Sequence, residues 1–82
     1  MSTLTADDAR AAVAAAVRAI VPDADLETLD DDESMREAFE LDSLDFLSFV
    51  EGLSTRTDIR IEESDYPQLT TMTDCVAFLT AG

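Results

Sequence analysis

The sequence predicts an all-α domain, a four-helix bundle with a short third helix and a long loop between the first two helices. The chain has 82 residues, which is the length of one domain, and 46% of them are hydrophobic, which supplies enough apolar surface for a thin core. Apolar residues recur at helical spacing, and residues that cap helices stand before these runs. We expect residues 1–82 to form a single domain.

The first helix is expected near the N-terminus. Thr5 is placed to cap it, and Asp7 and Asp8 follow in the first turn, where the helix dipole favours anions. The run over residues 9–21 is rich in alanine and carries its valines and isoleucines at helical spacing. Pro22 is expected to end this helix, so that it extends to residue 21.

The segment over residues 22–42 is too long to be structureless in a compact domain. Five apolar side chains are expected to hold it to the core, namely Leu26, Leu29, Met35, Phe39 and Leu41. Ser34 is placed to cap a short turn over residues 36–38.

The same segment is rich in acids, but its pattern does not fit a calcium-binding EF-hand loop. Such a loop starting at Asp23 needs glycine at its sixth position and glutamate at its twelfth, where Thr28 and Ser34 stand. We therefore predict a solvated acidic loop and no specific metal site.

A second helix is expected over residues 43–54, with Asp42 as its cap. Helical spacing places four apolar residues on one face as the core side, namely Phe46, Phe49, Val50 and Leu53. The opposite face carries Leu44, Asp45, Ser48 and Glu51, and Leu47 flanks the core side. Leu44 and Leu47, surrounded by acids, predict a small contact surface.

The C-terminal part predicts two more helices. Pro67 fits only the first turn of a helix, so the helix around residues 64–69 is expected to be short. Thr71 and Asp74 have the spacing of a capping box for a last helix over residues 73–79. Residues 59–61 alternate like a strand but have no predicted partner.

The composition excludes several classes of function. The net charge of −14 disfavours binding to nucleic acid or to an anionic membrane, and it favours protein partners with basic patches. The alternative is that the charge only keeps the protein soluble and implies no partner. Without histidine there is no imidazole base for a catalytic serine or cysteine. Cys75 lies in an apolar run and is expected to be a buried, inert thiol. No stretch has the pattern of a transmembrane span or a signal peptide, so we expect a cytoplasmic protein.

Ser43 is the candidate functional residue. It follows an acid at a predicted helix start, where unpaired N–H groups and the helix dipole receive a phosphate well. The alternative is an ordinary capping segment, because Asp-Ser before an apolar run is common at helix starts.

The segment Asp42-Ser43-Leu44-Asp45 with the following amphipathic helix resembles the prosthetic-group site of the acyl carrier protein family. The resemblance covers nearly the whole chain, including residues 58–61 and 69–74. It implies that Ser43 carries 4′-phosphopantetheine, whose thiol holds acyl groups as thioesters. It also implies a non-catalytic monomer that delivers these thioesters to partner enzymes of fatty-acid, polyketide or related biosynthesis.

The expected partners are a phosphopantetheinyl transferase and acyl transferases, ligases or ketosynthases with basic docking patches. The expected docking residues are Asp42, Leu44, Asp45, Leu47 and Glu51. Four positions depart from the family pattern: Glu40 replaces a common glycine, Ser48 and Ser54 each replace a common glutamate, and Glu51 replaces a residue that is often apolar. These departures favour a specialised pathway.

Three alternatives stay open. A carrier of aminoacyl or peptidyl thioesters shares the fold and the prosthetic group, although an aspartate before the serine is more typical of acyl carriers. An unmodified acidic interaction module would need no prosthetic group on Ser43. A hydrolase using Ser43 is disfavoured because the chain contains no histidine or lysine as a base.

Overall fold

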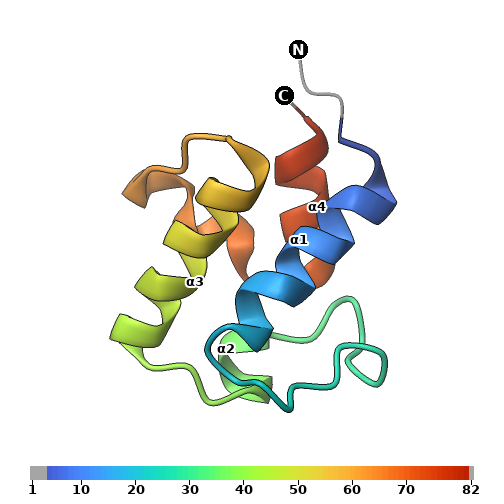
Figure 1. Ribbon diagram of the computed structural model, residues 1–82, viewed down its shortest axis with the longest axis vertical. Helices are drawn as coiled ribbons and strands as arrows, with labels where there is room; N and C mark the ends of the chain where they lie inside the picture. The colour runs from blue at the N-terminus through green and yellow to red at the C-terminus, as the bar shows by residue number, and fades with distance from the viewer. Residues whose placement is uncertain (1–3, 82) are drawn as a thin grey trace.

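The computed structural model describes residues 4–81 and contains five helical elements. They are α1 (Ala6–Arg18), α2 (Met35–Ala38), α3 (Ser43–Thr57), the 3₁₀ helix η1 (Glu63–Leu69) and α4 (Met72–Thr80). α1 packs against α3 and α4 and runs antiparallel to both, while η1 packs against α4 (Figure 1). No strand occurs within residues 4–81. The predicted all-α fold is confirmed, with α2 as an additional short helix inside the long loop.

The residues expected to cap helices do cap them, although α2 and α4 each begin one residue before the predicted ranges, at Met35 and Met72. The Thr5 hydroxyl accepts a hydrogen bond from the Asp8 N–H at 3.0 Å, and the Asp8 carboxylate accepts one from the Thr5 N–H at 3.2 Å. At α2 the Ser34 hydroxyl accepts a hydrogen bond from the Glu37 N–H at 3.4 Å, without a reciprocal bond. At α4 the Thr71 hydroxyl accepts from the Asp74 N–H, without a reciprocal bond, so the predicted capping box is only half formed.

The predicted helix ends are less accurate. α1 ends at Arg18 instead of residue 21, because Val21 precedes Pro22 and the chain tightens into a turn whose Ile20 N–H donates to the Val17 carbonyl. α3 continues three residues beyond the predicted residue 54. It ends at Thr57, and the next residue, Asp58, has a left-handed φ of 56° that stops the helix.

The expectation that Pro67 stands only in the first turn of a helix is wrong. Pro67 is the fifth residue of η1. A short 3₁₀ helix has few internal hydrogen bonds, so the N–H that proline lacks removes only one of them.

The core lies where α1, α3 and α4 meet. The predicted core side of α3 is buried in full, with Phe46, Phe49, Val50 and Leu53 all at most 7% exposed. α1 contributes Val13 and Val17 together with the small residues Ala9 and Ala16, which the apolar spacing alone did not single out. Loop and C-terminal residues complete the core, namely Ala24, Leu26, Met35, Leu69, Met72, Cys75 and Leu79.

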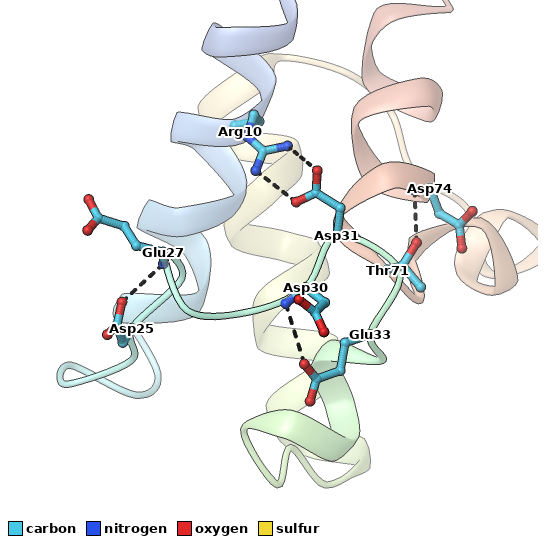
Figure 2. A network of polar contacts seen from close by, with 8 residues as sticks. All are labelled: Arg10, Asp25, Glu27, Asp30, Asp31, Glu33, Thr71 and Asp74. Carbon is cyan, nitrogen blue, oxygen red and sulfur yellow. Dashed lines mark hydrogen bonds and ion pairs between the residues drawn. The ribbon is translucent and has the colours of Figure 1, made fainter.

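The long acidic loop is attached to the bundle at several points. Arg10 of α1 makes two hydrogen bonds to the carboxylate of Asp31, at 2.8 and 3.1 Å (Figure 2). The Asp31 carbonyl also accepts a hydrogen bond from the N–H of Thr73 in α4, and the N–H of Met35 donates to the carbonyl of Thr70. The hydrogen bonds from Arg10, together with its charge, lower the pKa of Asp31 below its ordinary value.

Of the loop's expected apolar anchors, Leu26, Met35 and Leu41 are buried, and Leu29 and Phe39 are partly buried. The acids remain largely exposed, as predicted, but Asp31 is an anchor of the loop to α1. Within the described residues, no three acidic or cysteine side chains are grouped so that they hold a metal ion.

Glu40 has a backbone conformation that glycine adopts more easily. Its φ is 54°, in the left-handed region, at the turn between α2 and α3. This conformation costs a non-glycine residue about 1–2 kcal/mol, whereas glycine has no such cost but loses about 0.5–1 kcal/mol through the flexibility of the unfolded chain.

We predict that Glu40→Gly stabilises the protein by about 0.5–1 kcal/mol, a rise of several degrees in the melting temperature. The measurement is a thermal melt beside Glu40→Gln, which removes the same charge and keeps the backbone strain. An equal gain in both variants would assign the effect to charge and contradict the backbone argument.

Candidate functional site

The candidate site is the start of α3, where Asp42 caps the helix. The Asp42 carboxylate accepts a hydrogen bond from the Asp45 N–H at 2.8 Å, and the Asp45 carboxylate accepts one from the Asp42 N–H at 3.4 Å. The Asp42 carbonyl accepts the N–H of Phe46, the first bond of the helix. Asp42 is therefore the cap, as predicted, and Ser43 is the first helical residue.

Ser43 is exposed, and its hydroxyl forms no hydrogen bond within residues 4–81. Because Asp42 and Asp45 make the capping hydrogen bonds, the Ser43 hydroxyl is not needed to cap the helix. The N–H groups of Ser43 and Leu44 lie in the first turn of α3, where a helix has no internal acceptors for them. An exposed hydroxyl beside such donors is accessible to a partner enzyme and suited to carry an anionic group.

A pocket of about 430 Å³ lies beside Ser43. It is lined by Arg36, Ser43, Phe46, Leu47, Tyr66, Pro67 and Thr70, which come from α2, α3, η1 and the residue after η1. The sequence did not reveal this pocket, because its lining residues come from α2, α3 and the η1 region, which only the tertiary fold brings together. The individual residues carry no local signal for it.

Phe46 contacts two other residues that line the pocket, Tyr66 and Arg36. Its ring lies edge-on to Tyr66, with ring centroids 5.5 Å apart, and the Arg36 guanidinium lies 5.1 Å from its centroid. Such contacts orient side chains beyond what burial alone does. Because Phe46 itself is only 7% exposed, it anchors this arrangement to the core.

The predicted contact surface lies on the solvent side of α3. Leu44 is 73% exposed and Leu47 is 40% exposed, and these are the large hydrophobic residues that the fold leaves at the surface of residues 4–81. Glu51 is exposed on the same helix, and Asp45 is half-buried because its carboxylate takes part in the cap. Leu47 also lines the pocket, so the surface and the pocket adjoin.

Cys75 does not belong to this site. Its side chain is fully buried, and burial raises the pKa of the thiol to about 12, with the charge of Asp74 adding to the effect. The thiol is therefore protonated at neutral pH, as expected for an inert core cysteine.

The comparison with protein families identifies the type of domain. The PP-binding family model, described as "Phosphopantetheine attachment site", matches residues 11–79. Comparisons with curated proteins and with solved structures gave no significant match. Within residues 4–81, no helix combines the length and apolar character needed to cross a membrane.

The cap geometry predicts different effects for two neighbouring substitutions. We expect Asp42→Ala to lower stability by about 1 kcal/mol, several degrees in a thermal melt, because it removes the acceptor for the Asp45 N–H. Ser43→Ala should change stability little, because the Ser43 hydroxyl has no hydrogen-bond partner among the described residues and alanine is the best helix former. Melts of both variants test this; a larger loss for Ser43→Ala would show that Ser43 is the cap instead.

Proposed function

Because the chain belongs to the phosphopantetheine attachment site family, whose members carry 4′-phosphopantetheine covalently on a serine, we propose that Ser43 is the serine that carries it. The observation that supports this assignment best is the free Ser43 hydroxyl at the start of α3. The chain is thus a carrier protein, and the group is attached when the Ser43 oxygen bonds to the phosphate nearest pantetheine in coenzyme A. The pyrophosphate bond breaks, the adenosine bisphosphate leaves, and the hydroxyl proton passes to the transferase.

The other serines in the matched region fit this role less well. The Ser34 hydroxyl accepts the Glu37 N–H, and the Ser54 hydroxyl donates to the Ile59 carbonyl at 2.7 Å. Ser48 lies inside α3, and Ser64 lies within η1. None of these four combines a helix start with a free hydroxyl beside a pocket.

We further propose that the thiol of the prosthetic group holds acyl thioesters for fatty-acid, polyketide or related biosynthesis. The aspartate before Ser43 favours acyl over aminoacyl cargo, on the family resemblance. In this proposal the domain works as a cytoplasmic monomer that forms and breaks no bonds itself. A phosphopantetheinyl transferase loads it, and acyl transferases, ligases or ketosynthases then use the thioester.

The proposed docking surface consists of Asp42, Leu44, Asp45, Leu47 and Glu51. Exposed acids around two exposed leucines fit a basic partner, because rim charges raise the rate of encounter without making the complex long-lived. A carrier that serves several enzymes in turn needs such short-lived contacts.

The central prediction concerns the intact mass. With coenzyme A and a broad-specificity phosphopantetheinyl transferase, the wild-type protein should gain one phosphopantetheine, mapped by peptide mass spectrometry to Ser43. Ser43→Ala should gain none, whereas Ser48→Ala serves as a matched control and should load normally. Modification of another serine, or a loaded Ser43→Ala protein, would contradict the assignment.

For the docking surface, Glu51→Arg should slow loading by the transferase several-fold at low salt and less at high salt, because it reverses a charge beside Leu47. Glu27→Arg makes the same charge change in the loop and should load at the wild-type rate. Asp45→Arg is unsuitable, since Asp45 takes part in the cap of α3. Equal rates for both variants would place the docking surface elsewhere.

A further inference from the structure

The five arginines of this strongly acidic chain differ in their partners. Four of them interact with a carboxylate or a backbone carbonyl: Arg10 with Asp31, Arg60 with Glu62, Arg18 with the Ala24 carbonyl, and Arg56 with the Gly52 carbonyl. The Arg36 side chain makes no hydrogen bond or ion pair to any residue within 4–81; its guanidinium lies over the Phe46 ring. Among the five arginines, Arg36 is therefore the one whose guanidinium has neither a carboxylate nor a carbonyl partner among the described residues.

Arg36 lines the pocket beside Ser43. Its backbone is held on both sides, because the N–H of Met35 donates to the Thr70 carbonyl at 3.0 Å and the N–H of Leu41 donates to the Arg36 carbonyl at 2.9 Å. Met35 is also 2% exposed, which fixes α2 to the core. The guanidinium therefore lies at the pocket on a fixed backbone, and its contact with the Phe46 ring restricts the orientations of the Arg36 side chain.

A phosphodiester on Ser43 would bring a further negative charge to this end of the molecule. The carboxylates of Asp42 and Asp45 are already there, in a chain whose net charge is −14. The two free N–H groups at the start of α3 and the helix dipole offset part of this repulsion. A full positive charge on the same pocket offsets more, and a guanidinium matches the geometry of phosphate oxygens.

We propose that Arg36 is a positioning residue that pairs with the phosphodiester of 4′-phosphopantetheine on Ser43. This inference rests on the proposed attachment to Ser43. The pairing joins the first part of the prosthetic group to α2, so that the group leaves Ser43 along the pocket between α3 and η1. The remaining residues that line this pocket are Phe46, Leu47, Tyr66, Pro67 and Thr70.

A thermodynamic cycle between the arginine and the prosthetic group tests the pairing. Wild type, Arg36→Gln, Arg36→Lys and Arg60→Gln are each melted in the unmodified form and after loading from coenzyme A. Each unmodified variant is its own reference, so a general loss of stability cancels. Arg60 is the matched control, because its side chain is 87% exposed and is paired with Glu62 outside the pocket.

Loading should lower the melting temperature of Arg36→Gln by about 1–5 °C more than that of wild type, the size expected for an exposed ion pair in a small domain. Arg60→Gln should match wild type, Arg36→Lys should recover part of the difference, and added salt should reduce it. In phosphorus NMR, the phosphodiester resonance of loaded Arg36→Gln should move away from its wild-type position.

The outcomes separate this inference from the proposed function. If wild type gains no mass, attachment at Ser43 itself is wrong. If all variants load and show the same melting shift and phosphorus resonance, the pairing is wrong while attachment stands. An Arg36→Gln protein that only loads more slowly would make Arg36 a transferase contact and overturn the pairing.

Discussion

The reciprocal hydrogen bonds between Asp42 and Asp45 determine where α3 begins, and the rest of the site depends on that position. They make Asp42 the cap, so Ser43 becomes the first helical residue with an unused hydroxyl. The apolar face of the helix sets its rotation against the bundle. Phe46 then points into the core, while Leu44 and Leu47 remain at the surface.

Charge acts in this molecule in two ways. Most acids are exposed and give the surface its negative field, which suits brief contacts with basic partners. A few have specific structural partners: Asp31 attaches the long loop to α1, and Asp8, Asp45 and Asp65 accept hydrogen bonds at helix starts. The arginines are few, so the place of each one is informative, and Arg36 stands out by its position beside Ser43.

Features set by neighbouring residues were predictable from the sequence. Thr5, Ser34, Asp42 and Thr71 cap helices because capping is a local hydrogen bond, and the buried side of α3 follows from helical spacing. Ser43 was predicted as the functional residue from its place at a helix start together with the family resemblance, and its role stays a prediction.

Features set by tertiary contacts were not predictable in this way. The end of α1 depends on how the chain turns before Pro22. The 3₁₀ helix η1, which packs against α4, contains Pro67 beyond its first turn. The pocket depends on Arg36, Tyr66 and Thr70 meeting near Ser43, although these residues are far apart in the sequence. The left-handed Glu40 had an indirect signal, since glycine is common there in the family that the chain resembles.

The backbone hydrogen bonds from Met35 to Thr70 and from Thr73 to Asp31 have a consequence for how the site assembles. Each one joins segments more than thirty residues apart. The chain must therefore lose the conformational entropy of a long loop before either bond can form. The start of α3 can form early from local hydrogen bonds, whereas the η1 side of the pocket beside Ser43 comes into place only in the completed fold. A short peptide containing Asp42-Ser43-Leu44 therefore reproduces the serine without its surroundings. An enzyme that recognises those surroundings distinguishes a folded chain from an unfolded one.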